Sequence, residues 1–202
     1  MSLISRAKSM ILSPASEWTV VATEEPNAMG VFMGYVVPWI IIDAICAFIG
    51  HGIIWGGGHY GGAAMSWGMF FAVTTLFGQG LSVWVASAII NMLAPSFGSE
   101  KNMGRAMQTV AYSSSAMYLG KVLAILPFIG WLGSLFGLYG IYLFYLGLPH
   151  TMKTPQDKVI VYMVVGAVVM LVVYGIIAAI FSTLLMGVFG LGVIAGQGMM
   201  GM

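Results

Sequence analysis

Apolar residues fill five long stretches of the chain, and the few charged residues lie almost entirely between them. Each stretch reaches the roughly 20 residues that a helix needs to cross about 30 Å of hydrocarbon. The stretches are residues 28–50, 66–93, 104–126, 128–148 and 159–188. The pattern predicts an all-α polytopic membrane protein, in which residues 28–202 form a bundle of five transmembrane helices.

The preceding segment, residues 1–27, has a different pattern. Its first part places apolar residues at helical spacing opposite polar ones, which is typical of an amphipathic helix lying in the membrane interface. The apolar positions are Leu3, Ile4, Ala7, Met10, Ile11 and Leu12. Ser13 and Pro14 then start a second short helix, in which Trp18 is expected as an interface anchor, and Glu24 ends it. The alternative for this segment is a frayed tail.

The third stretch is more polar than the other four. Its polar residues would be costly facing lipid, so we expect the neighbouring helices to shelter them. They are Gln108, Ser113, Ser114, Ser115 and Lys121. The third helix is therefore predicted at the centre of the bundle.

Composition excludes a water-soluble fold. Of the 202 residues 60% are hydrophobic and 6% are charged, whereas soluble domains have roughly 45–50% apolar and about 25% charged residues. The basic residues lie on alternate connections, at Arg6, Lys8, Lys101, Arg105, Lys153 and Lys158. By the positive-inside rule the N-terminus is cytoplasmic and the C-terminus is periplasmic or extracellular. The net charge of +1 does not favour nucleic-acid binding, which needs a clustered basic face.

Several segments resemble one known family in their order along the chain. They are LSPASEW and EEP before the first span, YVVPW within it, NMLAPSFGSEKN closing the second, and LYGIYLFYLGLPHTMKTPQDK at residues 138–158. The chain resembles the Yip (Ypt-interacting protein) family of five-span membrane proteins, in its bacterial branch. The resemblance implies a multi-pass protein of the bacterial cytoplasmic (inner) membrane. Eukaryotic relatives are linked to Rab-type GTPases through a longer N-terminal region, so that role is not carried over.

Two charged residues, Asp43 and Lys121, lie well inside apolar stretches. Both are a few residues from the outer ends of spans that run in the same direction, so an ion pair between the first and third helices is predicted. An intramembrane charge is a functional candidate, and the alternative is a structural pair that sets the register of the two helices. Pro38 is expected to kink the first helix.

Three further groups of polar residues are candidates for sites. The polar stripe of the third helix, Gln108, Ser113, Ser114 and Ser115, together with Tyr139 and Tyr142 of the fourth, is a candidate polar lining inside the bundle. A cytoplasmic ionic latch is predicted to dock the N-terminal segment by pairing Glu24 and Glu25 with Lys101, Arg105, Lys153 and Lys158. Imidazole and thioether groups suit Cu(I), and the candidate metal ligands are His51, His59 and Met65. Ordinary loop and filler side chains are the alternative for these three.

No arrangement of nucleophile, histidine and carboxylate suggests catalysis, so we expect no enzyme and no cofactor. Two functions remain. The first is a non-catalytic integral membrane protein that organises the membrane or binds partners. The alternative is a transporter or channel for a small ion, proton or metal, using the polar residues of spans 1 and 3. The lipid bilayer is the expected partner, a homo-oligomer is compatible with the sequence, and no protein partner is identified.

Overall fold

The computed structural model describes residues 2–59, 61–123, 125 and 132–200, and within these residues it consists of helices and connections without a strand. Three helical runs in this part of the chain are long and apolar enough to cross a membrane. They are Ala28–Ile54, Gly61–Phe97 and Gln156–Ile177. The predicted class, an all-α membrane protein, is confirmed.

The N-terminal segment forms a hairpin of two short helices, α1 (Leu3–Leu12) and α2 (Pro14–Thr23). The Ser2 hydroxyl accepts a hydrogen bond from the Ser5 amide and so caps the first turn of α1. Ser13 separates the helices, and Pro14 begins α2 as predicted, because a proline at the first helical position loses no hydrogen bond.

The first long run is a series of four helical segments, α3 (Ala28–Val31), η1 (Phe32–Val36), α4 (Val37–Phe48) and η2 (Ile49–Ile54). The segments η1 and η2 are π-helical turns, in which the helix carries an extra residue per turn. The first of them ends two residues before Pro38, which has no amide hydrogen to donate. The irregularity predicted for the first helix is therefore present around Pro38.

The short helix α5 (Gly56–His59) precedes the second run. The run itself consists of η3 (Gly61–Ala63), α6 (Ala64–Thr74), the π-turn η4 (Thr75–Gln79), α7 (Gly80–Leu93) and η5 (Ala94–Phe97). Near its start, Gly68 packs directly on Gly52 of η2, so closely that a Cβ added at Gly68 would lie 2.6 Å from the Gly52 Cα. Small residues at this crossing allow the two backbones to approach.

The third run is broken at Ser114 into α8 (Met103–Ser113) and α9 (Ser115–Leu123). The Ser114 hydroxyl donates to the Val110 carbonyl at 2.8 Å and the Ser115 hydroxyl to the Tyr112 carbonyl at 2.5 Å. Serine side chains that bond the preceding turn compete with the backbone and bend helices. Every residue from 106 to 113 is buried, which confirms that the polar third stretch lies at the centre of the bundle.

The last helices are α10 (Leu132–Thr151), the short η7 (Gln156–Lys158) and α11 (Val159–Met200). The start of the predicted fourth span, residues 128–131, lies outside the described residues. The connection before α8 and the connection after α10 touch, because the Glu100 amide donates to the Met152 carbonyl at 2.8 Å. Two of the basic connections therefore share one end of the bundle.

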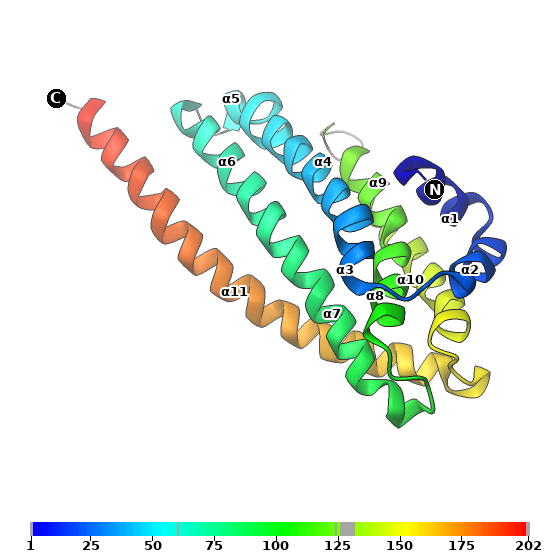
Figure 1. The fold of residues 1–202 in the computed structure, drawn as a ribbon. Helices are drawn as coiled ribbons and strands as arrows, with labels where there is room; N and C mark the ends of the chain where they lie inside the picture. Colours follow the sequence, from blue (N-terminus) through cyan, green and yellow to red (C-terminus); the bar gives the residue numbers. More distant parts are fainter. Residues whose placement is uncertain (1, 60, 124, 126–131, 201–202) are drawn as a thin grey trace.

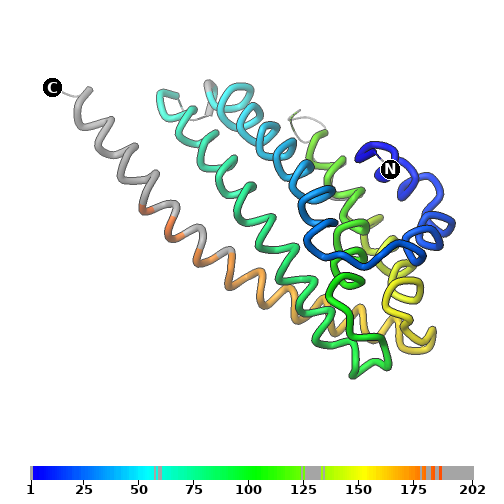
Figure 2. Tube along the Cα trace, in the orientation of Figure 1, coloured from blue at the N-terminus to red at the C-terminus, as the bar shows by residue number. Residues whose placement is uncertain are grey.

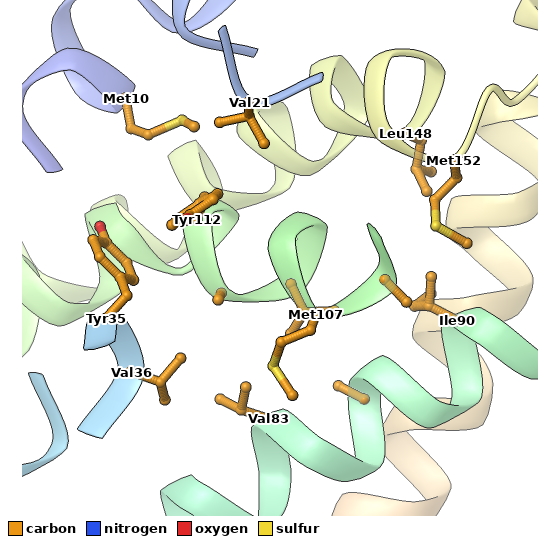
Figure 3. Packing of buried hydrophobic residues seen from close by; sticks show 14 of the residues in the cluster. Met10, Val21, Tyr35, Val36, Val83, Ile90, Met107, Tyr112, Leu148 and Met152 are labelled. Carbon is orange, nitrogen blue, oxygen red and sulfur yellow. The ribbon is translucent and has the colours of Figure 1, made fainter. Parts of the chain in front are cut away.

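Figure 1 shows the arrangement of these helices: α8 lies between α7 and α10, the hairpin packs on the side of α10, and α11 runs along α6 and α7. The trace in Figure 2 follows the same path and shows the hairpin beside α9 and α10. The buried core surrounds α8. In Figure 3, Met107 and Tyr112 of α8 lie among side chains from α1, α2, η1, α7 and α10.

Candidate functional site

The N-terminal hairpin is built around a buried arginine. Arg6 is 6% exposed, and its guanidinium donates to Glu17 of α2 at 2.6 Å and to Glu24, which follows α2. The guanidinium also lies 5.1 Å from the centre of the Tyr112 ring on α8, a distance at which a cation is attracted to the aromatic face. One side chain thus joins α1, the end of α2 and the central helix.

The charge of Arg6 is stabilised where it lies. Burial alone would lower the pKa of the guanidinium, but the hydrogen bond that it donates to Glu24 and the negative charges nearby outweigh this effect, and the pKa is raised above its ordinary value. The guanidinium therefore stays protonated inside the hairpin, and Glu17, which is 5% exposed, has a permanent cationic partner.

Hydrogen bonds and close packing hold the hairpin to the bundle. The Tyr139 hydroxyl of α10 donates to the Ile11 carbonyl at 2.7 Å, and Arg105 of α8 donates to the Val21 carbonyl at 3.0 Å. Trp18 is fully buried and lies against Gly147 of α10, where an added Cβ would be 2.7 Å from the indole ring. The expected interface anchor is therefore a buried packing residue, because Gly147 leaves room for its ring.

The hairpin contacts α10 along a considerable length. Tyr139 lies twelve residues before the end of α10 at Thr151, which corresponds to about 18 Å along the helix axis. The carbonyl of Ile11, near the end of α1, lies at that level, whereas Trp18 of α2 lies at the level of Gly147, closer to the end of α10. The end of α1 thus lies further from the C-terminal end of α10 than the middle of α2 does.

The charged residues of the predicted ionic latch that form ion pairs do so with partners other than those predicted. Glu24 pairs with Arg6, and Lys153 pairs with Glu100 at 2.5 Å between exposed side chains. Arg105 docks the segment by donating to the Val21 carbonyl, and it also donates to Gln108 on its own helix. In the part of the chain that the structure describes, no ion pair joins Glu24 or Glu25 to the four predicted bases, Lys101, Arg105, Lys153 and Lys158. The cation that pairs with Glu24 is Arg6 of the same N-terminal segment, and not a basic residue of the connections.

The second candidate site is the cluster of intramembrane charges. Asp43 and Lys121 do not form the predicted direct ion pair, because Gln79 lies between them. The Gln79 amide donates to Asp43 Oδ2 at 3.0 Å, and the Lys121 ammonium donates to Gln79 Oε1. Sequence reasoning missed Gln79, although it is a polar residue inside the second apolar stretch and that signal was available.

Two cavities adjoin this cluster. One, of about 390 Å³, is lined by residues that include Asp43, His51 and Lys121, and the other, of about 450 Å³, by residues that include Gln79 and Lys121. The Asp43–Gln79–Lys121 cluster therefore forms part of the wall between the two cavities. Thr75, from the π-turn η4, also borders both.

The candidate polar lining is divided among different partners. Ser115 bonds Tyr35 of η1 at 2.6 Å between hydroxyl oxygens, and Gln108 accepts from Arg105. Ser113 is buried, and its hydroxyl has no partner among the described residues. Tyr139 bonds the hairpin, while Tyr142 is 48% exposed and packs its ring on that of Tyr139. Ser115 and Tyr139 thus tie helices together, whereas Ser113 and Ser114 border a cavity of about 340 Å³.

The candidate metal ligands are not brought together into a site by the described residues. The His51 ring stacks on Phe71, with 3.8 Å between ring centres, and Met65 is 58% exposed. The side chain of His59 lies outside the described residues. No group of three or more histidine, cysteine or carboxylate side chains is placed to hold a metal ion in the part of the chain that the structure describes.

Long apolar helices around a buried polar centre define a polytopic membrane protein. The chain matches the Yip1 domain over residues 8–180 and belongs to that family. The match includes most of the hairpin, both cavities beside Asp43 and the first part of α11. Searches of curated proteins and of solved structures each found no match.

Proposed function

We propose that the chain is a non-catalytic, membrane-organising protein of the bacterial cytoplasmic (inner) membrane, with five spans. Three spans are the long apolar runs. The other two are the bent pair α8–α9 and α10, whose 20 residues correspond to a length of about 30 Å. The N-terminus is cytoplasmic and the C-terminus lies outside, because the basic connections with Lys101 and Lys153 share one end of the bundle.

The depth of the hairpin is the observation that carries this function. With α10 as a span, the bond from Tyr139 to Ile11 places the hairpin turn about 18 Å from the cytoplasmic end of α10, near the middle of a hydrocarbon layer about 30 Å thick. The hairpin therefore lies in the cytoplasmic leaflet, with the end of α1 deeper than the middle of α2. Its outer side exposes Ile4 at 73%, Leu12 at 68% and Val20 at 43%, which suits contact with lipid tails.

A hairpin of this kind widens the protein in one leaflet alone. Two helices of about 10–12 Å diameter are added to the cytoplasmic half of the bundle, and the buried Arg6 network keeps them in place. Insertion of helices into one leaflet makes binding sensitive to membrane curvature and lipid packing. We infer that the bilayer is the partner and that the hairpin is the element that acts on it.

The test is the diameter of liposomes that contain the purified protein, measured by electron cryomicroscopy at increasing protein-to-lipid ratios. The diameter should fall as the ratio rises for the wild type. The double variant Ile4→Ser, Leu12→Ser weakens the lipid-facing side of the hairpin and should reduce this effect.

The matched control is Met29→Ser with Met33→Ser, which removes two side chains of the first run that are each 57% exposed. This control should behave as the wild type. Equal vesicle diameters for all three proteins, or no dependence on protein content, would overturn the proposal. The family match gives the transporter alternative no support.

A further inference from the structure

The cavity beside Asp43 is distinct from the hairpin and has no part in the membrane-organising role. It measures about 390 Å³, and its lining includes Asp43, Cys46, His51, Trp55, Phe71 and Lys121. Two π-helical turns border it, since His51 belongs to η2 and Thr75 to η4. Single π-turns inside helices occur frequently at functional sites.

The carboxylate of Asp43 lacks a full set of partners. It is 3% exposed, Oδ2 accepts from Gln79 at 3.0 Å, and Oδ1 has no hydrogen bond from any described residue. An ionised carboxylate is costly to bury unless it is paired and hydrogen-bonded. The second oxygen is therefore a vacant position for a donor that carries positive charge.

Lys121 does not fill that position. Its ammonium bonds Gln79 Oε1, and among the described residues Asp43 forms no ion pair. Gln79 uses its amide nitrogen on Asp43 and its amide oxygen on Lys121. The bridging amide thus separates the two charged groups, and Lys121, which also lines the cavity, forms no direct ion pair with Asp43.

The rest of the cavity favours an organic cation over a metal ion. No group of three or more histidine, cysteine or carboxylate side chains is placed to hold a metal ion among the described residues. Instead the rings of Trp55 and Phe71 line the cavity, and His51 stacks on Phe71 with 3.8 Å between ring centres. A carboxylate beside aromatic rings recognises ammonium groups, through charge on one side and cation–π attraction on the other.

We propose that this cavity binds a primary ammonium group. The ammonium donates to Asp43 Oδ1 after the carboxylate rotates toward the cavity, and the alkyl part of the ligand packs against Trp55 and Phe71. Such a group has two sources, a soluble alkyl amine or the ethanolamine headgroup of a phospholipid.

The experiment uses the full chain in nanodiscs of phosphatidylcholine, with ethanolamine as the soluble probe. Ethanolamine should raise the midpoint of thermal unfolding in a saturable manner. The half-saturating concentration should be at least tenfold higher for Asp43→Asn and unchanged for Asp157→Asn, the same substitution at the chain's exposed second aspartate. Tetramethylammonium, which has no N–H donor, should give no rise at the same concentrations.

A second variant tests whether the cavity itself is needed, and a second lipid distinguishes a lipid headgroup from a soluble amine. Ala47→Leu fills the cavity from its wall while Asp43 is kept, and it should also abolish the response. If phosphatidylethanolamine nanodiscs raise the midpoint and free ethanolamine does not, the lipid headgroup is the ligand. The proposal is overturned if neither raises the midpoint of the wild type, or if Asp43→Asn and Ala47→Leu both respond as the wild type does.

Discussion

Two glycines of α10 differ in whether the hairpin leaves space for a side chain. A Cβ at Gly147 would lie 2.7 Å from the ring of Trp18, whereas a Cβ at Gly137 would have no atom within 4 Å. Both are helical positions of α10, so replacement by alanine raises helix propensity equally at each. Only Gly147 has a neighbour that must move.

We predict that Gly147→Ala lowers the free energy of unfolding by about 1–3 kcal/mol, the usual range for overpacking a filled site. The matched control, Gly137→Ala, should be neutral or stabilising. Thermal unfolding of the two variants in the same detergent gives the comparison. Equal midpoints would mean that Trp18 does not occupy the slot over Gly147.

A second residue-level prediction concerns the hydroxyl bond between η1 and α9. Tyr35→Phe removes the donor or acceptor that Ser115 meets at 2.6 Å, inside the protein, and should cost about 1–3 kcal/mol because the Ser115 side loses a buried partner. Tyr142→Phe is the control, since Tyr142 is 48% exposed and should change stability little. The comparison fails if both variants unfold at the same temperature.

At the scale of elements, the hairpin should behave as one unit that Arg6 holds together. Arg6→Met leaves Glu17 buried without its cation, and breaking a buried pair from one side typically costs about 3–5 kcal/mol. Hydrogen exchange should therefore become faster across α1 and α2, residues 3–23, while α8 keeps its protection.

Lys8→Met is the matched control, because Lys8 lies on the same helix and is exposed. It should leave exchange in the hairpin unchanged. Faster exchange in α8 as well would show that Arg6 supports the whole bundle and not the hairpin alone.

Periodicity and hydropathy gave the positions of the long helices but could not give the partners of their polar residues. The burial of the third stretch followed from its serines and Gln108, because such groups are costly in lipid. The docking of Trp18 depends on the absence of a side chain at Gly147, which lies far away in the sequence. The position of Gln79 between Asp43 and Lys121 depends on how three helices cross, which no local pattern specifies.

The sequence predicts only some of the breaks in the helices. Pro38 indicates an irregular first helix, and the structure has the π-turn η1 ending two residues before it. The interruption at Ser114 arises because adjacent serines bond the preceding turn, and the sequence alone does not say whether a serine bonds its own helix or a neighbour. The amphipathic pattern of residues 2–12 predicts a helix with Arg6 on its solvent-facing side, whereas Arg6 lies on the buried side of α1.

At the scale of the whole molecule, the number of crossings depends on α8, α9 and α10. Five spans place Gly58 and Gln156 on opposite sides of the membrane, and an arrangement in which only the three long apolar runs cross does the same. The two arrangements differ at Ile125, after α9. Five spans place Ile125 on the same side as Gly58, whereas three spans place it with Gln156.

We therefore predict that Gly58→Cys and Ile125→Cys react with a membrane-impermeant maleimide added outside intact cells, each in a Cys46→Ala background that removes the single native cysteine. Gln156→Cys should react only after the membrane is permeabilised, because the connection that holds it lies beside the basic connection before α8. Reaction of Ile125→Cys together with Gln156→Cys would contradict the five-span arrangement, and with it the depth assigned to the hairpin beside α10.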